Sequence, residues 1–221
     1  DGKTMVPMVS SMDHKRALDG DQGLNTGGMG TIAPNPYYTE AIAAECMEKI
    51  FLPTMHAMNA EGRTFKGCLY FGLMLTADGP KVIEYNCRFG DPETQVVLPL
   101  LESDLLTIMQ QIAAGTLAEA EVTFSKKSAC CVILASEGYP GKYETGYEIT
   151  LPADTSRIFV AGAKVKDGKL LSGGGRVLGV TEVADTLAEA VEKAYETVKT
   201  VHFANACYRK DIGKKALAAE V

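Results

Sequence analysis

The chain has 221 residues, enough for one large domain or two small domains with a sizeable core. Hydrophobic residues make up 46% and charged residues 23%, as in ordinary globular proteins, and the formal net charge is −6. Because the chain is acidic and Lys126-Lys127 and Lys214-Lys215 are only pairs, we expect no nucleic-acid or anionic-membrane partner. No apolar run approaches about 20 residues and no signal-peptide pattern is present, and the cysteine usage described below predicts a cytoplasmic protein.

The first residues, DGKTMVPMVSS, predict a turn followed by a strand over Thr4–Ser10, without an initiator Met. A strand needs a partner strand, so we expect this sequence to be a piece of a longer protein. A polar, Gly-rich segment follows. Apolar residues at helical spacing then predict a helix over Thr39–Met58, in which Pro53 favours a break or kink.

The middle of the chain predicts a hairpin and a divided helix. Phe65–Thr76 and Pro80–Asn86 have strand character and flank Ala77-Asp78-Gly79, a strong turn signal. Helical spacing continues over Glu93–Ala114, and Pro99 divides it into two parts. The residues expected to cap the second part are Ser103 or Asp104 at its start and Gly115 at its end.

The pattern changes after the polar stretch 116–127, where we place a domain boundary between residues 1–120 and 121–221. One amphipathic helix is predicted over Thr186–Thr200. Short strands are expected at Ser128–Ala135, Glu148–Leu151, Arg157–Lys166, Lys169–Leu171 and Val177–Val180. The six cysteines show no Cys-x-x-Cys spacing, which predicts reduced core residues rather than disulfides or a structural zinc site.

The first chemical signal is KVIEYNCRFGDPETQ, which begins at Lys81. Its start has strand character, so Glu84 and Asn86 are expected on one face, joined by Arg88 if the strand continues that far. A carboxylate and an amide carbonyl are oxygen ligands for a hard divalent cation. Val82 is predicted on the same face. The residues expected on the opposite face, toward a core, are Ile83, Tyr85 and Cys87.

The second signal is the Gly-rich segment LDGDQGLNTGGMGTIAPNP, which begins at Leu18. Glycine allows backbone N–H groups to converge on an anion, although an ordinary mobile turn explains the pattern as well. It is not a P-loop, because no Gly-Lys-Ser/Thr follows and residues 31–33 are predicted to be extended. SGGGRVLGV lies directly before a predicted strand rather than after one, so a dinucleotide site is not expected. The segment predicts a bend, with Arg176 as an anion contact.

These segments resemble the phosphoribosylamine–glycine ligase family. DHKRALDGDQGLNTGGMG, KVIEYNCRFGDPETQ, GYPGKYETG, GGGRVLGV and YRKDIG are similar to that family in this order, and RFGDPETQ is similar to its signature. The resemblance covers the whole chain but only about the C-terminal half of the family enzyme. It implies an α+β fold, in which the rear of an ATP-grasp module, an antiparallel sheet with helices on one face, precedes a small α+β domain.

The resemblance also implies a reaction. ATP phosphorylates the carboxylate of glycine, and the amine of 5-phosphoribosylamine attacks the glycyl phosphate to give glycinamide ribonucleotide, ADP and phosphate. Glu84 and Asn86 match the family's Mg²⁺ or Mn²⁺ ligands, and Arg88 is expected to stabilise charge on the transferring group. The missing N-terminal half is a necessary partner, so the fragment alone is expected to be inactive.

The other expected site residues bind substrate. Three of them have alternative structural roles. Lys15 forms a solvated basic pair with Arg16, Asp91 is a helix N-cap, or Arg176 lies in a plain bend. His14 lies in the family-like DHKR stretch. Another ATP-grasp carboxylate–amine ligase, or a remnant that binds metal or substrate without turnover, remains an alternative for the whole chain. The expected substrate-binding residues are Lys15, Asp21, Asn25, Gly27, Gly28, Asp91 and Arg176.

Overall fold

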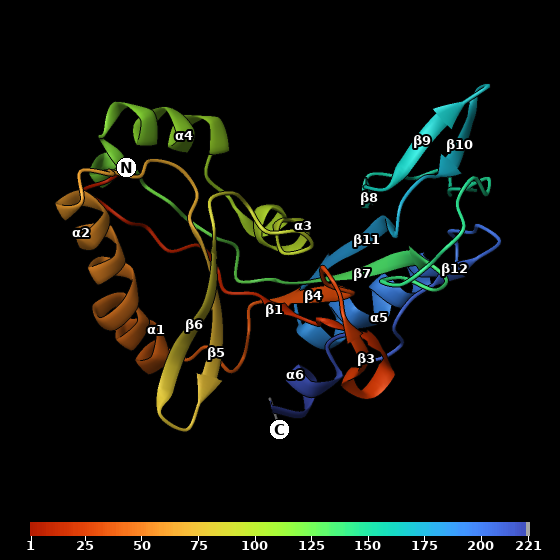
Figure 1. Ribbon diagram of the computed structural model, residues 1–221, viewed down its shortest axis with the longest axis horizontal. Helices are drawn as coiled ribbons and strands as arrows, with labels where there is room; N and C mark the ends of the chain where they lie inside the picture. The colour runs from red at the N-terminus through yellow and green to blue at the C-terminus, as the bar shows by residue number, and fades with distance from the viewer. Residues whose placement is uncertain (220–221) are drawn as a thin grey trace. The chain divides into compact units, whose positions relative to one another are not determined.

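The structure is a computed structural model in which residues 1–219 are described (Figure 1). The chain forms two compact units, each built from separate segments. Unit 1 consists of residues 1–9, 36–90 and 101–125. Unit 2 consists of residues 10–35, 91–100 and 126 onward. The predicted boundary after residue 120 does not follow this division, because two segments from the first half of the chain belong to unit 2.

Unit 1 contains the predicted long helix, but it is not regular throughout. Thr39 caps α1 (Glu40–Cys46) by accepting a hydrogen bond from the Ile42 N–H, and α2 (Leu52–Ala60) completes the helix. Between them lies a π-helical turn, η2 (Met47–Phe51). The π-helical turn ends two residues before Pro53, and the residues on both sides of it keep right-handed helical φ and ψ. The helix therefore continues past Pro53 without a break, and its irregularity lies directly before the proline.

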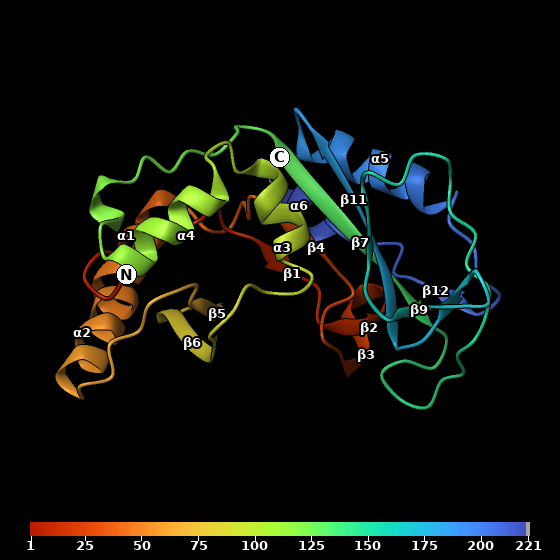
Figure 2. The same cartoon turned by 90° about the horizontal axis from the view of Figure 1, so that it is seen from above.

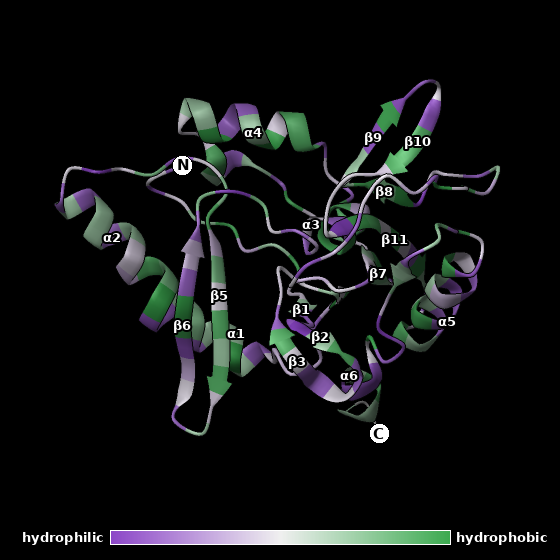
Figure 3. Cartoon of the chain, turned by 45° about the vertical axis from the view of Figure 1, so that its right-hand side comes forward, coloured by the Kyte–Doolittle hydropathy of each residue, from purple (hydrophilic) through white to green (hydrophobic). Residues whose placement is uncertain are grey.

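The predicted hairpin forms the sheet of unit 1. β5 (Tyr70–Thr76) pairs antiparallel with β6 (Gly79–Asn86), and their apolar side packs against the helix. Figure 3 shows β5 as a largely hydrophobic strand. The small core contains Cys46, Ile50 and Phe51, against which Phe71, Leu73 and Val82 pack.

A second helical segment also belongs to unit 1. α4 (Leu105–Ala114) begins at Asp104, whose carboxylate accepts a hydrogen bond from the Thr107 N–H at 2.6 Å. It ends at Gly115, which has the left-handed φ of 77° expected of a C-cap glycine. A short 3-10 turn, η4 (Leu117–Glu119), follows. Of the two predicted caps for this helix start, Asp104 is the one that the structure uses.

Unit 2 is organised by a six-stranded antiparallel sheet. Its path is β1 (Met12–Asp13), β4 (Gly30–Ala33), β7 (Ser128–Ser136), β11 (Arg176–Ala184) and β8 (Ile158–Val160). A further strand, β12 (Ala206–Cys207), also pairs with β7. All nine residues of β7 are buried, as expected for an apolar strand covered on both faces.

Helices cover both faces of this sheet (Figure 2). On one face, α5 (Leu187–Val198) buries Ala190, Ala194 and Val198 in a core that includes Cys130 and Val132. On the other face, α3 (Thr94–Val97) brings Gln95 near Gly179 and contacts β7. Thr186 caps α5 by accepting a hydrogen bond from the Glu189 N–H, so the amphipathic helix is confirmed.

The smaller elements surround this core. Glu148–Leu151, predicted to be a strand, forms only two isolated bridges, Glu148↔Leu171 and Thr150↔His202. Among the described residues, no helix is both long and apolar enough to cross a bilayer. The remaining elements are β2 (Arg16–Leu18), η1 (Asp19–Asp21), β3 (Gln22–Asn25), η3 (Leu98–Leu100), β9 (Ala163–Lys166), β10 (Lys169–Ser172) and α6 (Lys214–Ala219).

Two sequence-based expectations about the sheets are wrong. Thr4–Ser10 is not a strand, and the short strand β1 begins only at Met12. The sequence also predicts separate sheets for residues 1–120 and 121–221. Instead β4, from the Gly-rich segment, pairs with β7, because a fully buried central strand needs a hydrogen-bonding neighbour on each side. The α+β class and the antiparallel pairing are confirmed.

Candidate functional site

In unit 1, the hairpin sets the direction of the expected metal ligands. The Phe71 ring lies tilted against Phe51 and contacts Tyr85 edge-on, with centroid distances of 4.4 and 5.4 Å, so Tyr85 lies on the helix side. Side chains alternate along a strand, which directs Glu84 and Asn86 to the other side. The predicted pairing of these two residues on one face is therefore supported by the strand geometry.

A β-bulge changes the rest of the predicted face. Gly72 lies opposite Glu84 and Leu73 opposite Val82, so Ile83 is an extra residue without a partner in the pairing. Val82 consequently packs on the helix side, and its predicted position on the face of Glu84 is wrong. Ile83 is 62% exposed instead of lying in a core.

The residues that follow the strand also differ from the sequence-based expectation. β6 ends at Asn86, so strand alternation does not position Arg88. Arg88 is exposed, and its Nη1 donates a hydrogen bond to the Phe89 carbonyl at 2.9 Å. Cys87, expected in a core, is exposed. All six cysteines are free thiols, and only Cys46 and the pair Cys130-Cys131 are buried.

Glu84 and Asn86 fit a hard divalent cation. They present one carboxylate and one amide oxygen from the same strand face, with Cα atoms about 7 Å apart along an extended strand. Mg²⁺ commonly takes one or two protein ligands and completes its shell with phosphates and water. Within residues 1–219, no group of three or more His, Cys, Asp or Glu side chains is arranged to hold a metal. Two oxygen ligands match a cation that arrives with a nucleotide.

In unit 2, four of the expected substrate-binding residues lie together around Arg176. Its Nη1 donates to the carbonyl oxygens of Gly27 at 3.0 Å and Asp91 at 2.7 Å, and it also lies 3.4 Å from the Asp91 carboxylate. A Cβ on Gly28 would lie 2.5 Å from Pro92 and 2.6 Å from the Asp13 carboxylate. Hydrogen bonds and close packing therefore hold the Gly-rich loop at Gly27 and Gly28.

Lys15 lies beside this loop in a buried acidic setting. Its Nζ is 2.5 Å from Asp13 Oδ2 and 4.0 Å from Glu93 Oε1, and the two carboxylate side chains are only 7% and 4% exposed. The short contact between Lys15 and Asp13 is an ion pair, and it is the main compensation for the buried Asp13 charge. Burial raises the pKa of Asp13 to about 6, Glu93 adds to this rise, and Lys15 opposes it.

Asp21 lies in a different cluster. Its carboxylate accepts a hydrogen bond from Arg209 Nη1 at 2.9 Å and contacts the Lys215 ammonium. Arg209 is 2% exposed and also pairs with Asp211 at 2.8 Å. The hydrogen bond from Lys215, followed by those from Arg209, holds the pKa of Asp21 below its usual value. The structure therefore gives Asp21 an ion-pair role that the sequence did not indicate.

Asn25 and His14 are the remaining residues that were singled out from the sequence. Asn25 is an exposed residue at the end of β3, paired in register with Arg16. His14 is buried between two backbone groups: Nδ1 lies 3.2 Å from the Gly30 carbonyl, and the Gly213 N–H donates to Nε2 at 3.2 Å. These contacts fix a neutral imidazole with its proton on Nδ1, so His14 holds the backbone together.

Asp91 does not cap the following helix as predicted. The residue before α3 is Glu93, whose carbonyl accepts the Val96 and Val97 N–H groups. Asp91 instead accepts a side-chain hydrogen bond from Gln95 at 3.1 Å. The turn at Asp91 therefore presents its carbonyl and carboxylate to Arg176, and a direct substrate contact by Asp91 stays a prediction.

Three residues of these clusters were not predicted. Asp13 and Arg209 lie in the family-like stretches DHKR and YRKDIG, but no local pattern indicated their burial or their pairing. Tyr139 accepts the Gly27 N–H at 3.0 Å, and a Cβ on Gly175 would lie 2.2 Å from its ring. It belongs to GYPGKYETG, which the sequence analysis used only for the family resemblance. Tyr139 and Arg176 both form a hydrogen bond with Gly27, so GYPGKYETG and GGGRVLGV meet at the Gly-rich loop.

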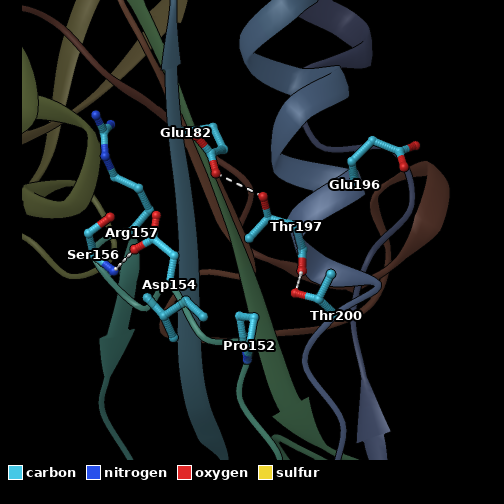
Figure 4. A pocket seen from close by; sticks show the side chains of 9 residues that line it. Pro152, Asp154, Ser156, Arg157, Glu182, Glu196, Thr197 and Thr200 are labelled. Carbon is cyan, nitrogen blue, oxygen red and sulfur yellow. Dashed lines mark hydrogen bonds between the residues drawn. The ribbon is translucent and has the colours of Figure 1, made fainter.

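A pocket elsewhere in unit 2 contains none of the expected site residues (Figure 4). Thr197 donates to Glu182 at 2.8 Å, and the Ser156 N–H donates to Asp154 at 2.9 Å, so several of its polar groups satisfy one another. We therefore assign it no part in the site. It is lined by Pro152, Asp154, Ser156, Arg157, Ile158, Glu182, Glu196, Thr197 and Thr200.

Two family models match the chain on either side of the predicted domain boundary. "Phosphoribosylglycinamide synthetase, ATP-grasp (A) domain" matches residues 1–94, and "Phosphoribosylglycinamide synthetase, C domain" matches residues 129–215. Together the two matches cover most of the chain. They agree with the order of domains that the sequence resemblance implied.

Curated relatives and a solved structure give the same result. The chain is 48% identical over 220 residues to a phosphoribosylamine–glycine ligase of Halalkalibacterium halodurans, covering 98% of this chain and 51% of that protein. It is 45% identical to the trifunctional purine biosynthetic protein adenosine-3 of Gallus gallus, covering 99% and 22%. The crystal structure of phosphoribosylamine–glycine ligase from Thermotoga maritima matches with a TM-score of 0.87 at 40% identity, covering 96% and 53%. The chain thus spans about half the length of the single-function relatives.

Proposed function

Because the chain belongs to the phosphoribosylglycinamide synthetase family, we propose that it supplies the metal-binding strand and the C domain of an ATP-dependent ligase. The ligase joins glycine to 5-phosphoribosylamine. A glycine carboxylate oxygen attacks the γ-phosphorus of ATP and ADP leaves. The amine nitrogen then attacks the carbonyl carbon of glycyl phosphate, phosphate leaves, and the nitrogen loses a proton.

The observation that carries this proposal is the shared face of Glu84 and Asn86 on β6. These two oxygen donors would hold Mg²⁺ or Mn²⁺ together with the ATP phosphates. When bound, the cation neutralises charge on the transferring phosphoryl group. Arg88 provides a further positive charge for the phosphoryl group and the later oxyanion.

The substrate-binding part of the proposal belongs to the loop in unit 2. Gly27 and Gly28, whose carbonyl oxygens Arg176 holds, form the substrate loop of this proposal, and Lys15 supplies a positive charge for phosphate. Asp91 orients Arg176. Free cysteines throughout the chain suit the reducing cytoplasm, where we place this reaction.

The test is a chimera, because the chain spans about half of its ligase relatives. The N-terminal half of the Halalkalibacterium halodurans ligase is joined ahead of Asp1, and ADP formation that needs both glycine and phosphoribosylamine is measured. We expect activity in the chimera and none above a no-enzyme control in the 221-residue chain. An ATP-grasp site holds the nucleotide between two parts, and positioning with water exclusion supplies most of the catalysis.

The metal assignment has its own variants in the chimera. Glu84→Ala removes the anionic ligand and is expected to lower turnover about 100-fold or more, with a much smaller change in the KM for glycine. Glu48→Ala, an exposed glutamate on the helix of unit 1, is the matched control and should leave turnover unchanged. Near-normal turnover of Glu84→Ala at saturating Mg²⁺ contradicts the assignment. ADP formation with a different amine acceptor would instead favour another ATP-grasp ligase.

A further inference from the structure

We infer that Gly72 is a positioning residue for Glu84: its missing side chain leaves the space across which the Glu84 side chain lies. This inference rests on the proposed metal-binding function of Glu84. Gly72 is in β5, opposite Glu84 in the register of the hairpin, so the two residues share one face of the sheet. No sequence motif marks Gly72, and it contributes no atom to the cation.

Steric contact, rather than backbone conformation, explains the glycine. A Cβ built on Gly72 would lie 2.8 Å from Glu84 Cγ, closer than carbon atoms approach without a shift. Gly72 is not among the residues with positive φ, so any residue could adopt its backbone conformation. A glycine inside a strand commonly marks a bulge or a close approach, and here both are present.

The bulge and the glycine act on the same carboxylate. The extra residue Ile83 places Glu84, rather than Val82, on the open face, and Gly72 then allows the Glu84 side chain to cross toward β5. An alanine methyl at position 72 would push Cγ away and rotate the side chain from its present direction. Metal ligands must hold their geometry within about 0.5 Å, so such a rotation weakens the cation site.

Gly72→Ala in the chimera tests the inference through Mn²⁺ affinity, measured by electron paramagnetic resonance with ATP present and independently of turnover. We expect Mn²⁺ to bind about tenfold more weakly and the Mg²⁺ concentration for half-maximal activity to rise by a similar factor. The melting temperature should not fall substantially, because the alanine fits the backbone and lowers the entropy of the unfolded chain. Met74→Ala, on the same strand and 53% exposed, is the control and should leave Mn²⁺ affinity unchanged.

A double-mutant cycle separates positioning from a general effect on the hairpin. In the Glu84→Ala background no Cγ remains to collide with, so Gly72→Ala should cause no further loss of Mn²⁺ affinity. A Gly72→Ala variant that binds Mn²⁺ within about twofold of the parent, while Glu84→Ala binds it poorly, overturns the inference and leaves the proposed function standing. An equal further loss in the Glu84→Ala background also overturns it. If Glu84→Ala itself leaves Mn²⁺ affinity unchanged, the proposed function fails first.

Discussion

The guanidinium of Arg176 lies directly against the backbone of Gly27. The Arg176 Nη1 donates to the Gly27 carbonyl at 3.0 Å, and its Cζ is 2.9 Å from the position that a Gly27 Cβ would occupy. Tyr139 holds the same residue from its N–H side. Gly27 is therefore a glycine because two long side chains hold its backbone closely, and this contact has a measurable consequence.

We expect Gly27→Ala to lower the free energy of unfolding by about 1–3 kcal/mol, as for other overpacked sites. Urea denaturation of the 221-residue chain measures this change. The added methyl collides with the Arg176 guanidinium, so Arg176→Ala should remove most of the penalty in the double variant. Additive losses in the double variant would show that the penalty comes from elsewhere in the loop.

Asp13 should make stability fall as pH rises. Burial and Glu93 raise the pKa of Asp13 to about 6, above the value of about 3.9 in an unfolded chain. The folded protein therefore binds this proton more tightly, and the stability that it adds below about pH 4 is lost as pH rises through about 6. The difference of about two pKa units corresponds to a full loss of about 3 kcal/mol in the free energy of unfolding.

The measurement compares urea midpoints of the parent and Asp13→Asn between about pH 4 and about pH 7. Because Asn does not titrate, the parent should lose up to about 3 kcal/mol relative to the variant across this range. Lys126→Gln, an exposed substitution in the same unit, is the control and should follow the parent. A constant difference between parent and Asp13→Asn at every pH would contradict the expected titration.

His14 should remain neutral well into mildly acidic solution. Burial lowers its pKa, and the nearby Arg209 adds to this effect. A second ring proton would oppose the Gly213 N–H that donates to Nε2. The stability given by neutral His14 is therefore present above the unfolded pKa of about 6.5 and lost as pH falls below it. Nitrogen-15 NMR of the imidazole checks this, and we expect the Nδ1–H form at about pH 6.5; a charged ring there would be contrary to the structure.

Arg209 should be important for stability because it is buried with two carboxylates. Arg209→Ala removes the guanidinium that pairs with Asp211 and one of the two cations that pair with Asp21, and it is expected to cost about 3–5 kcal/mol. Burial acts to raise the pKa of Asp211, but hydrogen bonds led by that from Arg209 outweigh it and hold the value at about 2. Lys169→Ala, which breaks the exposed pair with Glu148, is the control and should change stability by less than about 1 kcal/mol. Similar losses for both variants would refute the special role of Arg209.

The sequence predicted elements with local signals well. The amphipathic helix that follows Thr186, the Asp104 cap and the left-handed Gly115 depend on residues a few positions apart. The bulge at Ile83 was not predictable, because it depends on the register with β5 and both neighbours of Glu84 are β-formers. The inserted residue reverses the face of Val82 but leaves Glu84 and Asn86 together, so their shared face follows from strand alternation while the position of Val82 does not.

The clusters of unit 2 show the same limit. Lys15 and Arg176 were singled out as charges, but Glu93 beside Lys15 and Asp91 beside Arg176 come from distant parts of the chain. Asp21 looked like part of a substrate loop, although Arg209 and Lys215 neutralise it. A single sequence shows which charges exist, while burial and pairing decide their state, and these depend on tertiary contacts.

The pairing of β4 with β7 has a consequence for the order of folding. Gly30 pairs with Val132, and residues 36–90 and 101–125, which belong to unit 1, lie between them in the sequence. Closing so long a loop costs little extra stability, because the entropy grows only with the logarithm of its length, but distant pairings form slowly. During synthesis, β4 leaves the ribosome long before its partner. We therefore expect residues 10–35 of a nascent chain to remain unprotected from hydrogen exchange until residues 128–136 have emerged.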